Sequence, residues 1–201
     1  MSTTEAPATD ATATDDEHCG LRERKKQRTR QSMHEAALAL VTDRGLAGVT
    51  VEEICAEAGV STRTFFNYFS SKGHAALGLP GTAIPHHARE AFLASDGQLV
   101  HDLCDLVAST VELPEDRSRM KALVQARPEM VPTMLQWMAD ARLAVYEVAC
   151  ERTDADTART ATTLVMAAVI ETAHRVSVGS RDELAARVRG VVAEMGRLAA
   201  S

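Results

Sequence analysis

An amphipathic helix is the first regular pattern in the chain. Apolar side chains recur at the spacing of one helix face, at Met33, Ala36, Ala37, Leu40 and Val41. Gly45 follows them, and glycine commonly ends a helix because it adopts the left-handed conformation without strain. The helical pattern starts at about Arg24, so we predict a first helix with a basic segment at its N-terminus.

Two short helices are predicted directly after the first. Thr50 and Glu53 have the spacing of a capping box, and the helix that they start ends at Gly59. Ser61 can cap the next helix, so only a tight connection separates the two. This arrangement is typical of a helix-turn-helix. Aromatic rings are expected to form its core, because Phe65 and Phe69 face inward together.

The rest of the chain is helical in pattern and shows no β-strand alternation, so the predicted fold class is all-α. Breaks at proline, glycine and aspartate residues give predicted helices near 71–78, 86–94, 98–112, 115–125, 129–151, 155–178 and 181–199. We expect the last two helices to pack together and to join a second subunit in a four-helix bundle. The residues expected at this interface are Leu164, Val165, Ala168, Val169, Val188, Val191, Val192 and Met195.

Charge is unevenly distributed at the N-terminus, although the 201 residues carry a net charge of −6. Residues 1–20 contain acidic side chains but no lysine or arginine, and no large apolar residue beyond Met1, so we predict a disordered acidic tail there. Residues 21–30 are strongly basic. The overall acidity therefore does not exclude a nucleic-acid partner.

Several classes of protein find no support in the sequence. No apolar run is long enough for a membrane helix, and the N-terminus lacks the pattern of a signal peptide, so we expect a cytoplasmic protein with no membrane partner. The four cysteines are widely separated, which favours reduced thiols over disulfides or a zinc ribbon. Motifs of serine, carboxylate-pair, zinc or phosphate-loop enzymes are not recognisable, so we expect neither an enzyme nor a cofactor.

Three motifs around the helix-turn-helix occur together at a characteristic spacing: T-x-x-x-I from Thr50, A-G-V-S from Ala58 and Y-F-x-x-K from Tyr68. In these motifs, residues 24–77 resemble the DNA-binding domain of the tetracycline-repressor (TetR) family. The remainder matches only in kind, as a helical domain that in the family binds an effector and dimerises. The resemblance implies a DNA-binding domain at 21–75 and an effector-binding and dimerisation domain at 76–201.

The function implied by this resemblance is that of a homodimeric transcriptional repressor. It would bind double-stranded DNA at a palindromic operator and be released by an unknown small-molecule effector. A transcriptional activator of the same fold and a non-specific DNA-binding protein remain as alternatives, because the sequence does not separate activation from repression.

The third helix is expected to read bases, since Arg63 can pair with guanine and Asn67 with adenine in the major groove. A helical projection places Thr64 on that side as well, with Phe66 and Tyr68 on the flanks. Thr50 would cap its helix in any case, and a basic segment is often simply solvated. The full set of expected DNA contacts is Arg24, Lys25, Lys26, Arg28, Arg30, Thr50, Thr62, Arg63, Thr64, Asn67, Tyr68 and Lys72.

Two departures from the family pattern lie in the same region. The family commonly has tyrosine where this chain has Phe66, which has no hydroxyl to reach a phosphate. Gly73 follows Lys72 where the family often has acidic helix formers, so a weaker start of the fourth helix is expected.

An effector pocket is implied by the resemblance, and flexible methionines in the middle helices suit one. The alternative is that these methionines are simply core. His101 and Cys104 could share a metal, but two ligands do not make a site, and we expect none. A buried Cys104 or Cys150 is expected to be inert rather than a thiol sensor. The candidate pocket residues are His101, Cys104, Met120, Met130, Met134, Trp137, Met138, Tyr146 and His174.

Overall fold

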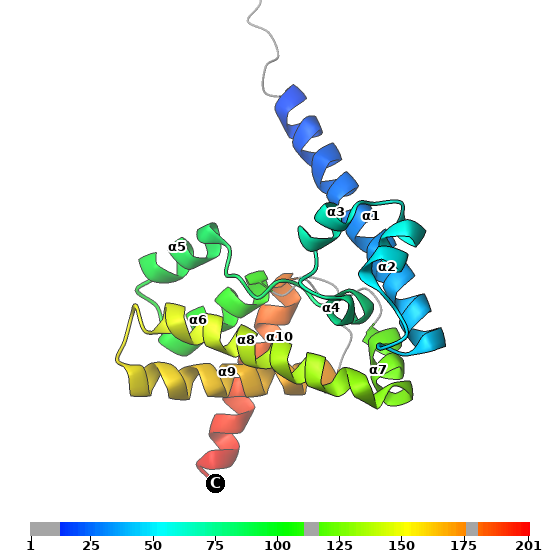
Figure 1. Cartoon of the computed structure of the whole chain (residues 1–201). Helices are drawn as coiled ribbons and strands as arrows, with labels where there is room; N and C mark the ends of the chain where they lie inside the picture. Colours follow the sequence, from blue (N-terminus) through cyan, green and yellow to red (C-terminus); the bar gives the residue numbers. More distant parts are fainter. Residues whose placement is uncertain (1–12, 111–116, 176–180) are drawn as a thin grey trace, which may run out of the picture. The chain divides into compact units, whose positions relative to one another are not determined.

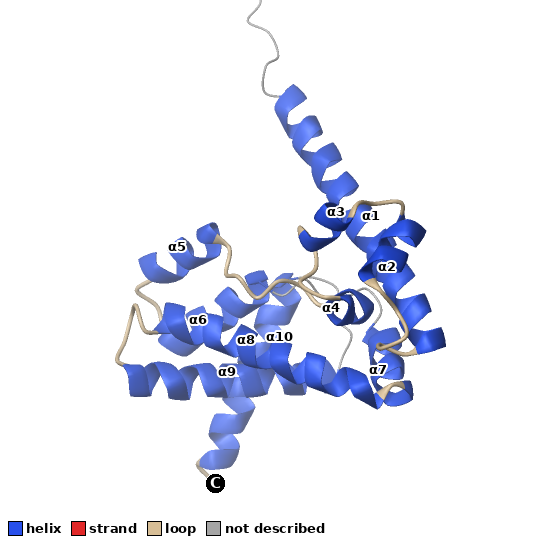
Figure 2. Cartoon of the chain, viewed as in Figure 1, coloured by secondary structure: helices blue, strands red, loops and turns tan. Residues whose placement is uncertain are grey.

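The computed structural model describes residues 13–110, 117–175 and 181–201. Every regular element within these ranges is a helix, as Figure 2 shows, which confirms the all-α fold class. None of the helices in the described part is long and apolar enough to span a membrane. The chain divides into two compact units, residues 1–76 and 77–201, and the division falls inside the fourth helix.

The N-terminal unit contains α1 (Ala13–Arg44), α2 (Val51–Ala58), α3 (Thr62–Phe66) and α4 (Lys72–Leu77), as Figure 1 shows. Its core is small and includes two phenylalanines as predicted, because Phe65 is fully buried and Phe69 is 2% exposed. The apolar face of α1 covers them and their neighbours with Met33, Ala37 and Val41, all fully buried. The third helix ends at Phe66, so Asn67 and Tyr68, which the helical projection treated as part of it, lie after its end.

The first helix begins earlier than the sequence predicted. Residues 1–12 of the expected disordered tail lie outside the described residues, but α1 starts at Ala13, so the part from residue 13 to 20 is helical. The prediction rested on the lack of apolar side chains, which prevents packing but not helix extension. Each residue added to an existing helix gains one backbone hydrogen bond, so a helix held by its C-terminal half can continue without a buried face.

The C-terminal unit holds the remaining helices: α5 (His86–Ala94), α6 (Leu99–Thr110), α7 (Arg117–Ala126), a short 3₁₀ turn η1 (Pro128–Met130), α8 (Val131–Ala149), α9 (Ala155–Arg175) and α10 (Arg181–Ala199). All seven helices predicted after the helix-turn-helix are present, and their ends lie within a few residues of the expected ones, except that the expected ends at 112, 115 and 178 lie outside the described residues. One apolar cluster joins α5, α6, α8, α9 and α10. Leu103 of α6, Val165 of α9 and Leu184 of α10 are buried in it.

The predicted dimer residues on α9 and α10 do not form a free surface. Val165, Ala168, Val188 and Val191 are 0 to 8% exposed, because the helices of the same chain already cover them. The other four residues predicted at the interface are half-buried: Leu164, Val169, Val192 and Met195. The outer face of α9 instead carries Met166, Ala167 and Ile170. Val165, Ala168, Val188 and Val191 therefore belong to the internal core, whereas a subunit contact through Leu164, Val169, Val192 and Met195 stays a prediction.

Candidate nucleic-acid interface

The turn between α2 and α3 is built by the residues that the sequence marked. The Thr50 hydroxyl accepts a hydrogen bond of 3.2 Å from the Glu53 N–H, and the Thr50 N–H donates to the Glu53 carboxylate over 2.8 Å. This is the predicted capping box. Gly59 ends α2 in the left-handed conformation, with φ of 67°, which a residue with a Cβ adopts only with strain. The backbone therefore turns directly into the cap of α3.

The exposed face of α3 carries Thr62, Arg63, Phe66 and Asn67. The described structure shows no partner for the guanidinium of Arg63 or the side-chain amide of Asn67, so both are available to a ligand. Phe66 lies on this face rather than on its flank, and its side chain is 58% exposed. Phe65 and Phe69 anchor the opposite side in the core. Helix α3, held by its buried side, thus presents one basic, one amide and one aromatic side chain on the same exposed face.

Thr64 and Tyr68 are less accessible than the other predicted contacts on this helix. The Ser61 hydroxyl caps α3 by accepting from the Thr64 N–H over 3.0 Å, and it also shares a hydrogen bond of 2.8 Å with the Thr64 hydroxyl. Thr64 is half-buried, so its hydroxyl serves the helix cap. Tyr68 is half-buried as well, in the turn that follows α3. Their contacts with DNA stay predictions.

Lys72 connects the start of α4 to the start of α2. Its ammonium donates a hydrogen bond of 2.7 Å to the Val49 carbonyl, next to the cap residue Thr50. The Ser71 hydroxyl accepts from the His74 N–H over 3.2 Å, which caps α4 and offsets the cost of Gly73 within it. Lys72 therefore has a structural partner in addition to the phosphate that the sequence predicted for it.

An ion pair that the sequence analysis missed supports the cap of α2. A guanidinium nitrogen of Arg44, the last residue of α1, donates to the Glu53 carboxylate over 2.7 Å. This hydrogen bond, together with those from the Thr50 N–H and hydroxyl, lowers the pKa of the Glu53 carboxyl from 4.5 to about 2. A basic residue at the C-terminus of a helix was visible in the sequence, but its partner depends on how the loop folds back.

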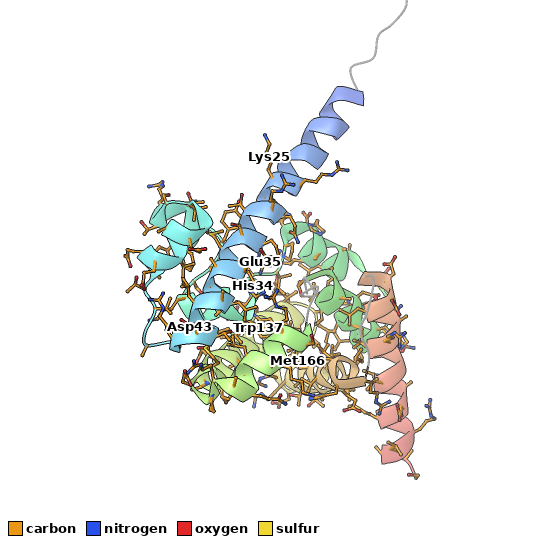
Figure 3. All side chains as sticks on the ribbon, turned by 90° about the vertical axis from the view of Figure 1, so that its right-hand side faces the viewer. Lys25, His34, Glu35, Asp43, Trp137 and Met166 are labelled. Atoms are coloured by element: carbon orange, nitrogen blue, oxygen red, sulfur yellow. The ribbon has the colours of Figure 1, made fainter. Side chains whose placement is uncertain are left out.

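The basic segment forms part of α1, and its side chains differ in how accessible they are. Arg24, Lys25, Lys26 and Arg28 are exposed, whereas the Arg30 guanidinium stacks on the Phe69 ring at 5.1 Å from its centroid. Figures 1 and 3 show this part of α1 extending beyond α2 and α3, with the Lys25 side chain directed away from the helix. A helix about 10 Å wide does not enter a minor groove of about 6 Å, so phosphates are the better target for these side chains.

The candidate effector residues lie at different depths in the C-terminal unit. His101 and His174 are exposed, and the His174 ring is hydrogen-bonded to the Ile170 carbonyl at 2.9 Å, so neither histidine lies in the interior. The Trp137 indole N–H donates to the Pro80 carbonyl over 2.9 Å. Met130 is fully buried, and the half-buried candidates are Met120, Met134, Trp137, Met138 and Tyr146.

Cys104 has the properties of an inert core residue. It is fully buried on α6, and burial, with a smaller effect from the charge of Asp105, raises the pKa of its thiol to about 11. A thiol that stays protonated at neutral pH is a poor nucleophile and a poor metal ligand. Its predicted neighbour His101 points to the surface instead. Within the described residues no group of three or more metal-ligating side chains occurs.

The capped α2–α3 pair, with the aromatic core beneath it, defines a helix-turn-helix protein. The family model of bacterial regulatory proteins, tetR family, matches residues 34–74, from the middle of α1 into α4. The match covers the helix-turn-helix region, which is similar to this family, and does not extend to the rest of the chain.

A curated relative is similar to this chain over a longer stretch of residues. The HTH-type transcriptional regulator TcmR of Streptomyces glaucescens is 45% identical over 76 residues, which make up 38% of this chain. The same residues span only 31% of the relative.

Solved structures of similar proteins are more distant. NalD, the secondary repressor of the MexAB-OprM multidrug efflux pump in Pseudomonas aeruginosa, is 16% identical with a TM-score of 0.41, over 84% of this chain and 96% of its own. A putative TetR-family regulator from Mesorhizobium loti has the same identity and TM-score, over 84% and 95%. The multidrug-binding protein EbrR, complexed with imidazole, is 18% identical with a TM-score of 0.35, over 80% and 92%. Likeness at this level supports no conclusion about a ligand.

Proposed function

We propose that this chain is a ligand-responsive transcriptional repressor that binds a palindromic operator as a homodimer. The observation that carries the proposal is the exposed face of α3, where Arg63 and Asn67 stand free of partners in the described structure while Phe65 and Phe69 fix the helix from below. Arginine and asparagine are the side chains that pair bidentately with guanine and adenine. Catalysis would need neither group in that position.

The phosphate contacts in this proposal come from the positive groups around α3. Four basic side chains in the part of α1 that extends beyond α2 and α3 are exposed and would contact phosphates: Arg24, Lys25, Lys26 and Arg28. The exposed N-terminus of α2 would also offer a phosphate those backbone N–H groups of its first turn that the capping box of Thr50 and Glu53 does not use. Such contacts position the protein on the duplex, whereas Arg63 and Asn67 supply the preference for sequence.

The dimer in this proposal is formed by the outer faces of α9 and α10. Ile170 on α9 is 38% exposed and lies on one face with Met166 and Ala167. On α10 the exposed residues include Ala186, Gly190 and Ala193, which repeat on one face and let another helix approach closely. A two-fold axis there would present two copies of α3 to successive major grooves, about 34 Å apart.

The effector in this proposal is a small, mainly apolar molecule taken up among the middle helices. The candidate residues that are wholly or partly buried are Cys104, Met120, Met130, Met134, Trp137, Met138 and Tyr146. To release the operator, the effector must bind more tightly to the DNA-incompetent arrangement than to the DNA-bound one.

The proposal is tested by selecting duplexes from random DNA and then titrating the winner and a scrambled duplex at two salt concentrations. A palindrome bound roughly a thousandfold tighter than the scrambled duplex is the expected result. Uniform, weak and purely salt-controlled binding would show a non-specific DNA-binding protein instead.

Two variants separate base reading from phosphate binding. Arg63→Ala should weaken binding to the selected palindrome by about tenfold or more for each half-site while leaving scrambled DNA nearly unchanged. Lys25→Ala is the matched control, because Lys25 is exposed on the free part of α1; it should weaken both duplexes alike and lower the salt slope by about one unit per subunit. Equal losses on both duplexes for Arg63→Ala would remove Arg63 from the base-reading set.

A further inference from the structure

Phe66 is an exposed aromatic side chain for which the proposed function so far gives no role. Among residues 24–76, whose burial the structure describes, it is the only large apolar side chain in the exposed class, at 58%. A single exposed apolar residue is common on protein surfaces and by itself indicates nothing. The position of Phe66 on the molecule is what distinguishes it.

The ring shares its helix face with the two groups assigned to base reading. At about 100° per residue, Thr62, Arg63, Phe66 and Asn67 fall within one arc of α3, and all four are exposed. Arg63 and Asn67 lie on one side of Phe66, and Thr62 lies one turn before it. A duplex that reaches both polar side chains therefore also comes close to the ring beside them.

The ring is held in place before any partner arrives. It packs edge-on against Phe65, with centroids 5.4 Å apart and ring planes at 89°, and Phe65 is fully buried. A short aromatic side chain with a fixed neighbour loses little conformational freedom on binding. It therefore acts as a rigid apolar contact rather than a flexible one.

The chemistry of the major groove leaves one partner for such a ring. Base edges there offer hydrogen-bond donors and acceptors, which a phenyl group cannot use, and one apolar group, the C5-methyl of thymine. Phosphates are equally unsuitable, since Phe66 has no hydroxyl. We infer that Phe66 contacts a thymine methyl in each half-site and so selects A·T over the other pairs at one operator position. This inference rests on the proposed function, because it requires α3 to enter the major groove.

The direct test replaces thymine by uracil, which removes the methyl group and nothing else. In the selected palindrome each thymine is changed in turn, symmetrically in both half-sites, and the dissociation constants of wild type and Phe66→Ala are measured. One position should cost the wild type about fourfold per half-site, or about fifteenfold for both, as expected for one methyl group returned to water. Phe66→Ala should bind the thymine and uracil duplexes within twofold of each other.

Three further variants make the result specific to the ring. Phe66→Leu keeps an apolar side chain and should retain most of the uracil penalty, which also covers the case in which Phe66→Ala binds too weakly to measure. Thr62→Ser removes the only methyl group among the four exposed side chains of this face and keeps the hydroxyl, so it should leave the uracil penalty unchanged. Leu135→Ala removes an equally exposed apolar side chain, 59% exposed on α8, and should behave as wild type.

The outcomes separate this inference from the proposed function. If no palindrome is selected, the proposed function fails first. If a palindrome is bound but replacing thymine by uracil weakens binding at no position, the inference is wrong. It is also wrong if Phe66→Ala keeps the full wild-type penalty. In both cases the proposed function as an operator-binding regulator is unaffected. Equal weakening of all duplexes by Phe66→Ala, with the uracil penalty intact, would place the ring against the sugar-phosphate backbone instead.

Discussion

Glu53 shows at the scale of one residue how the helix-turn-helix depends on pH. Its carboxylate receives hydrogen bonds from Arg44 and from the Thr50 backbone and hydroxyl, and these bonds favour the ionised form. The folded pKa of about 2 therefore lies below the ordinary value of 4.5. A depressed carboxyl pKa stabilises the folded state above the unfolded pKa, and this contribution falls as the pH is lowered from about 4.5 to about 2.

The variant Glu53→Gln tests this dependence because it removes the titrating group and keeps a side chain that suits a capping box. We expect the wild type to be more stable than the variant at about pH 6, and the difference to shrink steadily as the pH falls toward about 3. Urea unfolding at several pH values, followed by circular dichroism, measures it. A difference that is constant over this range would show that the Arg44 and Thr50 contacts do not persist in solution.

At the scale of elements, Arg152 joins three parts of the C-terminal unit just after α8. Its guanidinium donates to the Asp102 carboxylate over 2.7 Å, to the Phe92 carbonyl over 2.9 Å and to the Gly97 carbonyl over 3.2 Å. It also stacks on the Phe92 ring at 4.6 Å from the centroid. Since both charged side chains are only 15% exposed, removing one of them leaves the other charge poorly solvated.

Arg152→Ala should therefore destabilise the protein by about 3 kcal/mol, and Arg152→Lys should recover only part of the loss, because an ammonium cannot reach three acceptors as a planar fork does. Arg89→Ala is the matched control. Arg89 pairs with Glu151, but the two side chains are 40% and 38% exposed, so the cost should stay below about 1 kcal/mol. Chemical unfolding of the three variants gives the loss of unfolding free energy for each. Similar losses for Arg152→Ala and Arg89→Ala would contradict the prediction.

The elements that the sequence predicted best are those specified by local chemistry. Thr50, Gly59 and Ser61 act within a few residues of themselves, so the caps and the turn of the helix-turn-helix followed from spacing alone. The exposure of Phe66 and the partial burial of Thr64 were harder to predict. The hydrogen bond with the Ser61 hydroxyl holds the Thr64 side chain at the helix cap, while Phe66 stays exposed. The Arg44–Glu53 pair and the contacts of Arg152 join residues that are distant in sequence, which no periodicity records.

At the scale of the whole molecule, periodicity identified the apolar faces of α9 and α10 but not which of them remain outside. Both helices are apolar over a wide arc, so periodicity alone does not separate the side that faces the chain's own core from the exposed side. Val165 and Val188 are buried in the core, whereas Ile170 on α9 is exposed, and the proposed dimer would use this exposed face.

Ile170→Glu tests the proposed dimer. A charge at this 38% exposed position should have little effect on folding of the single chain but should oppose burial between two chains, so we expect a monomer and a loss of operator binding. Leu135→Glu places the same charge at a 59% exposed leucine on α8 and should remain dimeric. Sedimentation velocity gives the mass of each variant. A dimeric Ile170→Glu would move the interface away from α9.

Gly190→Ala tests the α10 half of the same interface by an opposite effect on the two states. A Cβ added at Gly190 meets no atom within 4 Å in the single chain, and alanine favours a helix over glycine by about 1 kcal/mol, so the isolated chain should become more stable. If a second α10 packs closely against this position, the added methyl group separates the two helices and weakens the dimer. Thermal unfolding over a range of protein concentrations distinguishes the effects, because only the dimer contribution depends on concentration. A variant that gains stability equally at every concentration would show that Gly190 lies outside the interface.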